Sequence, residues 1–299
     1  MDTAAADRDS GAMERFVDIS PATRLWVQEI GDGDSSPLLL IMGSNYSGVA
    51  WPDALVHTLA EHHRVIRYDH RDTGRSSWAF DKHPYAVGDL AEDAIAILDA
   101  LDVERAHVVG MSMGGVLVQL LLLDHPDRLR SATMIMTSAL GAGLAADPHD
   151  DNAPALPGPD PELLRLWEHF TDPRSREEEL TWRVAHWRIL AGSVLPFHAE
   201  EFRRLEERVM DHAGRHDTPA AHARATATGF NRAAELAGVR TPTLVIEAPE
   251  DPVNPPPHSN HLAQLIPTAR MVTVPGMGHA LSAAVMDPLC QAILAHTGS

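Results

Sequence analysis

The chain has 299 residues, 44% of them hydrophobic and 22% charged, which fits one large globular domain or a domain with an insertion. Its 24 basic and 42 acidic residues give a net charge of −18, which disfavours binding to nucleic acid or to an anionic membrane surface. The one cysteine, Cys290, cannot form an internal disulfide. Without a signal-like start or a long apolar run, the sequence predicts a soluble, cytoplasmic protein.

Strands and helices alternate in the first part of the chain. Residues 1–13 are small and acidic and predict a disordered tail. Several of the following strand-like runs are apolar throughout, as in strands that are buried on both faces. The expected strands are 15–19, 25–30, 37–42, 64–68, 106–111 and 131–137, and the expected helices are 52–62, 85–101 and 114–124. This alternation predicts an α/β fold with a mostly parallel, doubly wound sheet.

The middle of the chain has a different pattern. A loop rich in Gly, Ala, Pro and Asp precedes amphipathic stretches with no convincing strand, at 162–170, 174–190, 199–213 and 219–230. Strands at 242–247 and 270–274 and a helix at 288–296 then resume the first pattern. We therefore expect an α/β core of residues 14–137 and 236–299. Residues 138–235 are expected to form a helical lid over the carboxyl edge of the strands, where open α/β sheets bind ligands.

The most informative motif is Gly-Met-Ser-Met-Gly at residues 110–114. It is a G-x-S-x-G sequence between an expected buried strand and an expected helix, which is the setting of a nucleophile elbow. A serine on that sharp turn projects its hydroxyl from the sheet edge, and the glycines let the turn pack closely. Ser112 is therefore the candidate nucleophile. The alternative is a glycine-rich turn in which Ser112 only caps the helix.

A serine nucleophile needs a base, and the base needs a group that orients it. His279 lies in a glycine-rich loop after the last expected strand, where it can reach the edge that carries Ser112. The chain has seventeen other histidines, so His279 could instead be a surface-loop residue. Asp251 lies four residues beyond the strand at 242–247 and is preferred to its neighbour Glu250 as the orienting carboxylate. The order Ser, Asp, His is that of α/β hydrolases.

With these motifs the chain resembles the serine hydrolases of the α/β-hydrolase fold. Residues 68–76 are similar to that family's D-x-R-G-x-G-x-S loop, with Asp72 in place of its first glycine, and the loop is expected to shape the sheet edge near the nucleophile. The similarity covers essentially everything from about residue 24 onward, except that the lid is only generally similar.

More narrowly, the chain resembles the aclacinomycin methylesterase group. The shared features are Met42-Gly43 followed by Asn45 and Trp51-Pro52, RYDHRDTGRS at 67–76, HVVGMSMG at 107–114, WRIL at 187–190, EERVMDHA at 206–213, IPTAR at 266–270 and PGMGHAL at 275–281. That group hydrolyses the carbomethoxy ester of anthracyclines, which are polycyclic aromatic polyketides. The free β-keto acid can then lose carbon dioxide. The resemblance implies an esterase of this kind, with a hydrophobic small molecule as its substrate and no cofactor.

An esterase of this kind needs two N–H donors for the oxyanion. The first donor is expected to be the backbone N–H of Met113, the residue after the nucleophile. The second is expected in the loop after residues 37–42 and is the backbone N–H of Ser44, where the methylesterase group has a glycine. Four further residues are expected to contact the substrate: Asn45, Trp51, Trp187 and Met277. The tryptophans, with others in the lid, could form a stacking wall for a flat substrate, or they could be lid core; Met277 could line a pocket or pack in the core.

Several alternatives stay open at this point. The same triad also serves peptidases, lactonases, carbon–carbon bond hydrolases and cofactor-free haloperoxidases, and a ligand-binding protein could keep the fold with little turnover. A metal site is not expected, because Gly214 interrupts the helical spacing of His212 and His216 and no third ligand is apparent. No nucleotide-binding motif is present, and the sequence does not indicate the oligomeric state.

Overall fold

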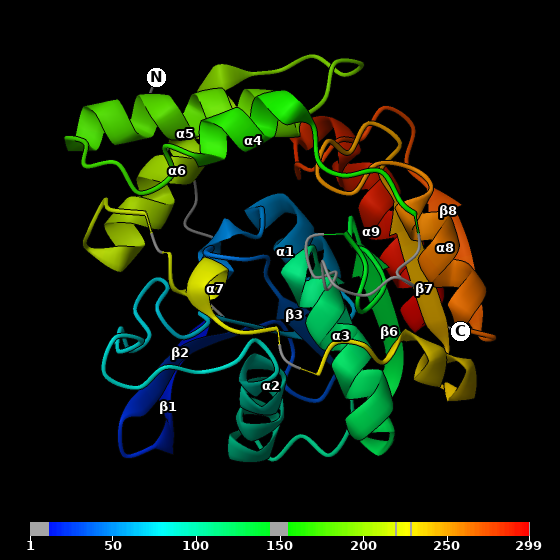
Figure 1. Cartoon of the computed structure of the whole chain (residues 1–299). Helices are drawn as coiled ribbons and strands as arrows, with labels where there is room; N and C mark the ends of the chain where they lie inside the picture. The colour runs from blue at the N-terminus through cyan, green and yellow to red at the C-terminus, as the bar shows by residue number, and fades with distance from the viewer. Residues whose placement is uncertain (1–11, 144–154, 219, 228, 299) are drawn as a thin grey trace, which may run out of the picture.

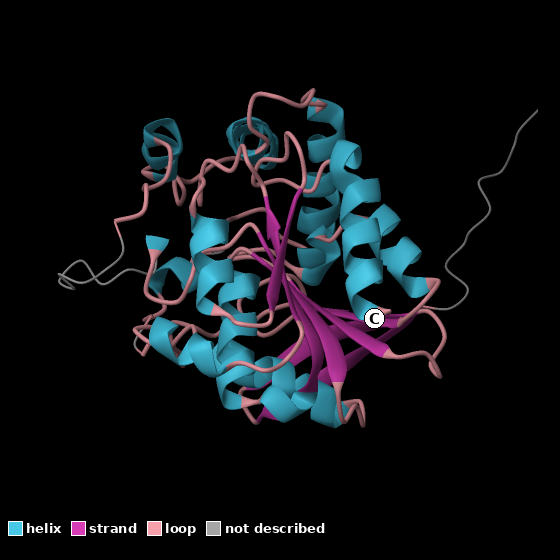
Figure 2. Cartoon of the chain, turned by 90° about the vertical axis from the view of Figure 1, so that its right-hand side faces the viewer, coloured by secondary structure: helices cyan, strands magenta, loops and turns pink. Residues whose placement is uncertain are grey.

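An eight-stranded sheet runs through the centre of the protein in the order β1-β2-β4-β3-β5-β6-β7-β8 (Figures 1 and 2). The computed structural model describes residues 12–143, 155–218, 220–227 and 229–298. β2 pairs antiparallel with β1 and β4, and from β4 onward every neighbouring pair is parallel. The strands are β1 (Met13–Ser20), β2 (Thr23–Ile30), β3 (Pro37–Ile41), β4 (Arg64–Tyr68), β5 (Ala106–Met111), β6 (Leu129–Ile135), β7 (Thr243–Glu247) and β8 (Ala269–Thr273).

Helices cover both faces of the sheet because its central strands are apolar on both sides. In β3, Leu39 and Ile41 pack into one core cluster, whereas Leu38 and Leu40 pack into the other. The first cluster includes side chains of α2 (Asp89–Ala100), α3 (Met113–Asp124) and α8 (His258–Leu265). The second includes side chains of α1 (Asp53–Ala60) and α9 (Met286–Thr297). The mostly parallel, doubly wound sheet that the sequence predicts is therefore confirmed.

The remaining helices cross the end of the sheet where the parallel strands finish (Figure 1). They are α4 (Pro161–Trp167), α5 (Arg176–Leu190), α6 (Ala199–Ala213) and the one-turn α7 (Ala221–Arg224). The C-terminal end of α5 contacts the loop after β8, since His279 N–H donates to Leu190 O at 2.6 Å. In α6, His212 Nε2 lies 2.7 Å from a carboxylate oxygen of Asp69, the residue after β4. We call α4 to α7 the cap.

One expected helix was wrong in extent, and one helix was missed. Among the described residues of the stretch 219–230, only α7 is helical, and the alanine-rich sequence is interrupted by Thr226 and followed by Gly229. The helix α8 was not predicted, because His258, Ser259 and the next two polar residues hide its apolar period. The strand β1 begins at Met13, one residue before the expected core, and residues 1–11 of the expected tail lie outside the described residues. In the part of the chain that the structure describes, no helix has the length and apolar character of a membrane span.

Buried histidines give the fold a pH dependence. Burial lowers the pKa of His70 to about 3 and the pKa of His107, His186 and His222 to about 4, since an imidazolium is poorly solvated in the interior. In the unfolded chain a histidine titrates near 6.5. As the pH falls from 6.5 towards 4, the unfolded chain therefore takes up protons that the folded chain does not. The contribution of these neutral histidines to the free energy of unfolding is fully present above pH 6.5 and is lost progressively as the pH falls towards 4.

We expect the unfolding midpoint Tm, followed by circular dichroism, to fall continuously between pH 6.5 and pH 4. For His222 alone the shift to about 4 corresponds to roughly 3 kcal/mol of unfolding free energy. The variant His107→Asn cannot titrate at this position and should show a shallower decline. A decline as steep as that of the wild type would contradict the contribution of His107.

Candidate active site

Ser112 occupies a strained turn between β5 and α3. Its φ of 55° and ψ of −121° lie in a region that residues other than glycine rarely adopt. The neighbouring glycines make this turn possible. A Cβ on Gly110 would lie 2.2 Å from the carbonyl oxygen of Gly114, and a Cβ on Gly114 would lie 2.2 Å from that of Ile41. The G-x-S-x-G sequence is thus required by backbone packing, and it has the strand–turn–helix geometry of a nucleophile elbow.

His279 and Asp251 form a buried hydrogen-bonded pair in the loops after β8 and β7. His279 Nδ1 lies 2.9 Å and 3.0 Å from the two carboxylate oxygens of Asp251, and the two residues are 6% and 2% exposed. Asp251 Oδ1 also accepts backbone N–H bonds from Val253 at 2.7 Å and Asn254 at 3.0 Å. These bonds aim the carboxylate at Nδ1, which leaves Nε2 of the imidazole available to a further partner. Among the described residues, Glu250 has no hydrogen bond to this histidine.

Backbone contacts between loops place Ser112 at the same edge as this pair. Ser112 N–H donates to Ile135 O at the end of β6, at 2.9 Å. The next residue, Met136, accepts a hydrogen bond from Asn254 Nδ2 at 3.3 Å, and Asn254 N–H is one of the donors to Asp251. Among the described residues, Ser112 Oγ and the His279 ring do not hydrogen-bond each other. Such contacts are often long in a protein without substrate and tighten when it binds.

The turn after β3 lies beside the serine. A Cβ on Gly43 would lie 3.4 Å from Ser112 Cβ and 3.9 Å from Ser112 Oγ. Tyr46 N–H donates to Gly43 O at 3.5 Å and closes the turn, and Asn45 has a φ of 63°. Within the described residues, the N–H groups of Ser44 and Met113 donate no hydrogen bond. Two free backbone donors near a serine hydroxyl are the components of an oxyanion hole.

The structure does not bring all of the expected substrate contacts to this edge. Trp51 and Met277 are 0% exposed and pack in the hydrophobic core, so neither side chain offers a surface to a ligand in this conformation. Asn45 is half-buried in the turn beside Ser44. Residue type alone could not distinguish these positions, because a large apolar side chain near the site satisfies burial equally well in the core.

Trp187 is also buried, because it takes part in the packing of the cap. Its ring stacks on Phe202 with 5.2 Å between the ring centroids, and its Nε1 donates to Glu206 Oε1 at 2.6 Å. The same carboxylate oxygen accepts the hydroxyl of Tyr46 at 2.8 Å, and Arg183 donates to the other oxygen at 2.9 Å. Glu206 thereby joins α5 and α6 to the turn after β3. This role of Glu206 could not be predicted from the sequence, since a single Glu in an amphipathic helix is usually solvated.

Trp167 is one of the lid tryptophans considered for a stacking wall, and it pairs with His186, which the sequence did not indicate as a site residue. Trp167 Nε1 donates to His186 Nε2 at 3.0 Å. Burial, and then repulsion from His279, lowers the pKa of His186 to about 4. His186 lies one helical turn before Leu190, whose carbonyl oxygen accepts His279 N–H at 2.6 Å. Trp167 is only partly buried, so it is better placed than Trp51 to offer a flat apolar surface.

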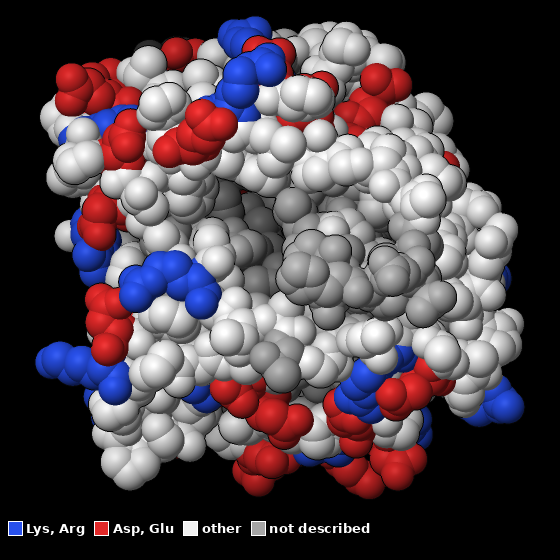
Figure 3. Space-filling view, in the orientation of Figure 1, with Lys and Arg blue, Asp and Glu red and all other residues white. Residues whose placement is uncertain are grey.

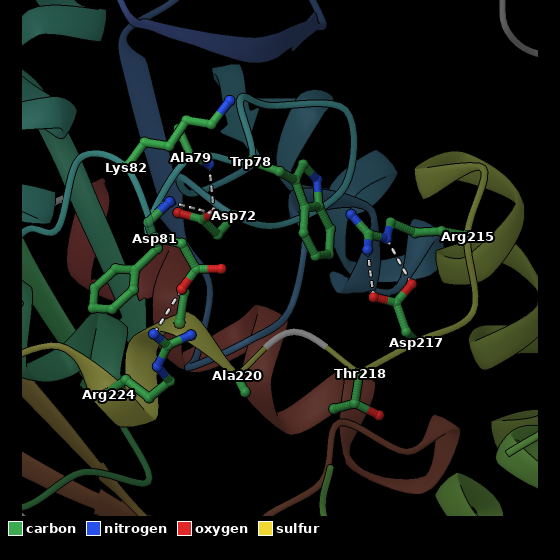
Figure 4. Close-up of a pocket in the computed structure, with 12 residues that line it drawn as sticks. Asp72, Trp78, Ala79, Asp81, Lys82, Arg215, Asp217, Thr218, Ala220 and Arg224 are labelled. Atoms are coloured by element: carbon green, nitrogen blue, oxygen red, sulfur yellow. Dashed lines mark hydrogen bonds and ion pairs between the residues drawn. The ribbon is translucent and has the colours of Figure 1, made fainter. Parts of the chain in front are cut away.

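Figure 3 shows that this face of the molecule is hollowed between the cap helices and the sheet core. A cavity of about 350 Å³ lies between the loop after β4 and the segment that joins α6 to α7, and residues 78–82 and Arg215 are among its lining (Figure 4). Ser112, Asp251 and His279 do not line it. His212 and His216 do not share a helix face, because α6 ends at Ala213 and Gly214 turns the chain with a φ of 66°.

The comparisons agree with this geometry. The family model described as the alpha/beta hydrolase fold matches residues 36–283. The chain is 47% identical to rhodomycin D methylesterase DauP of Streptomyces sp. (strain C5), over 91% of this chain and 94% of that protein. It is equally identical, with the same coverage, to rhodomycin D methylesterase DnrP of Streptomyces peucetius. A crystal structure of a hydrolase from Pseudomonas aeruginosa PA01 is 26% identical and superimposes with a TM-score of 0.72, covering 96% of this chain and 98% of that one. The chain therefore belongs to the α/β-hydrolase fold family, within the group that its sequence motifs indicated.

Proposed function

We propose that this protein is a cofactor-free serine esterase that hydrolyses the methyl ester of a bulky aromatic polyketide such as an anthracycline. The observation that carries the proposal is the buried His279–Asp251 pair at the sheet edge where the strained turn presents Ser112. The substrate class is supported by two relatives, both rhodomycin D methylesterases, at 47% identity over 91% of this chain.

The proposed mechanism uses the five site residues in two half-reactions. His279 Nε2 takes the proton of Ser112 as Oγ attacks the ester carbonyl carbon. Asp251 holds the Nδ1–H and stabilises the positive charge that forms on the ring. The N–H groups of Ser44 and Met113 stabilise the oxyanion. Methanol then leaves with the proton from His279, and a water molecule attacks the acyl-enzyme by the same steps in reverse to release the carboxylic acid.

Substrate binding belongs to the hollow between the cap and the core, where we place a hydrophobic small molecule. We assign Asn45 to the catalytic end of this hollow, because it lies in the turn that carries Ser44 and has a φ of 63°. Trp51, Trp187 and Met277 are buried, so in this proposal they stabilise the packing around the site and do not contact the substrate directly. The partly exposed Trp167, fixed by its bond to His186, is a candidate for the apolar face that a flat ring system would contact. The protein's location in the cytoplasm also stays a prediction.

The proposed reaction is tested by incubating the enzyme with a carbomethoxy anthracycline and measuring product masses. We expect the substrate to lose the mass of one CH2 group as methanol is released. A further loss of CO2 from the β-keto acid would show that decarboxylation follows, and its rate without enzyme would separate an assisted from a spontaneous step. A panel of lactones and anilides serves as the comparison. Faster turnover of a lactone or an anilide than of the methyl ester would contradict the proposal and favour a lactonase or a peptidase.

A further inference from the structure

The turn that carries Ser44 is bound by a histidine of the cap. Asn45 N–H donates to His222 Nδ1 at 2.8 Å, across a sequence separation of 177 residues. His222 belongs to α7, the one-turn helix of the cap, and is 5% exposed. Its ring is therefore a buried side-chain acceptor for the backbone next to the expected oxyanion donor.

The partners of His222 fix its tautomer. The amide of Asn45 can only donate, so Nδ1 must carry a lone pair. The other ring nitrogen, Nε2, lies 3.0 Å from the carbonyl oxygen of Arg71, which can only accept, so Nε2 must carry the proton. Burial lowers the pKa of His222 to about 4, which keeps the ring neutral near pH 7. Both nitrogens are thus used, and the ring cannot turn over without losing both bonds.

The helix α7 is itself held against the core. Val87 N–H donates to Thr226 O at 2.9 Å, and Ala86 and Thr226 form a parallel bridge. Arg224 forms an ion pair with Asp81 at 2.7 Å, and both border the cavity of Figure 4. Since the backbone on the C-terminal side of α7 is hydrogen-bonded to the core, the position of His222 relative to the turn is held by these contacts.

The turn needs such an acceptor. Asn45 adopts a φ of 63°, which costs free energy for any residue with a side chain. The hydrogen bond that closes the turn, from Tyr46 N–H to Gly43 O, is long at 3.5 Å. An Asn45 N–H without its partner would be left unpaired in a largely buried turn, and a different arrangement of the peptide planes would then compete.

We propose that His222 is a positioning residue of the oxyanion hole: by accepting Asn45 N–H it fixes the turn from which Ser44 N–H is presented to the reacting carbonyl. The inference rests on the proposed function, because it assigns Ser44 its role in ester hydrolysis. Two substitutions of His222 distinguish the hydrogen bond at Nδ1 from the hydrogen bond at Nε2. In His222→Asn an amide oxygen can lie where Nδ1 lies and accept Asn45 N–H. In His222→Gln an amide nitrogen can lie where Nε2 lies and donate to Arg71 O, while the acceptor for Asn45 is lost.

The expected result is a loss in kcat for His222→Gln of about 10- to 100-fold with p-nitrophenyl butyrate, with KM changed by less than about threefold, because an oxyanion contact acts in the transition state. His222→Asn should recover at least about tenfold of that loss. The rate at which a fluorophosphonate labels Ser112 should follow the same order, and this readout requires no particular ester. His107→Asn is the matched control: it changes a buried histidine at the opposite end of β5 and should lower Tm without lowering kcat.

The outcomes separate this inference from the proposed function. The positioning role would be overturned by equal losses of kcat in the Gln and Asn variants, by an effect on KM alone, or by a wild-type kcat for His222→Gln. In each of these cases an inactive Ser112→Ala would still support the esterase proposal. If Ser112→Ala kept its turnover, the esterase proposal itself would fall, and the positioning role with it.

Discussion

Ser112→Ala should lower kcat for ester hydrolysis by about 10⁴-fold or more, because the variant lacks the hydroxyl that forms the acyl-enzyme in the proposed mechanism. The loss should not come from unfolding. Ser112 Oγ has no hydrogen bond within the described residues, and alanine keeps the Cβ that the turn already accommodates at a φ of 55°. Tm should therefore change little. The measurement is kcat with a chromogenic ester, together with fluorophosphonate labelling of the intact protein.

A suitable control is Ser131→Ala, which removes a buried hydroxyl near the start of β6, at the far end of the sheet. Its hydrogen bond to His107 is lost, so Tm should fall while labelling and turnover persist. If Ser112→Ala were still labelled, the nucleophile would have to be another residue.

Asp251→Asn should lower kcat by roughly 10³- to 10⁴-fold, although the side chain keeps its size. The reason lies in the two backbone donors, Val253 N–H and Asn254 N–H, which bind Asp251 Oδ1. They would hold the amide oxygen of the asparagine and turn its NH2 group towards His279 Nδ1. The imidazole would then carry its proton on Nε2, where it cannot accept the proton of the serine.

The matched comparison for Asp251→Asn is Glu250→Gln, which changes the neighbouring carboxylate and leaves His279 with its partner. We expect near-wild-type kcat for that variant across the pH–rate profile. A loss in kcat for Glu250→Gln as large as that for Asp251→Asn would contradict the assignment of Asp251 alone as the carboxylate that orients His279.

The residues of the proposed triad could be selected from the sequence because their positions depend on rules that the chain obeys locally. Parallel strands end at one edge, so residues in the loops that follow β5, β7 and β8 are expected to lie near one another. Ser112 was recognisable because its flanking glycines cannot be replaced without a backbone clash. The geometry of Asp72 also follows local rules: it stands where the family has glycine, has a φ of 58°, and accepts the N–H groups of Ala79 and Phe80.

The substrate contacts and the cap contacts could not be predicted in the same way. The residue type of Trp51 predicts that its side chain is buried, but it does not predict whether a ligand or the protein covers that side chain. His222 binds Asn45 across 177 residues, and it lies in a stretch whose alanines suggested a longer helix. Such a contact depends on how two distant segments pack, so a local sequence pattern does not predict it.

The insertion of the cap between two neighbouring strands affects how the protein is made. β6 ends at Ile135 and its partner β7 begins at Thr243, about 110 residues later. At typical rates of about 5–20 residues per second, the ribosome needs roughly 5–20 s to synthesise the intervening segment. Throughout that time the apolar edge of β6 has no partner and is exposed to chaperones or to aggregation. Both Asp251 and His279 emerge afterwards, so under the proposed mechanism we expect a nascent chain to have no esterase activity until its last strands have docked.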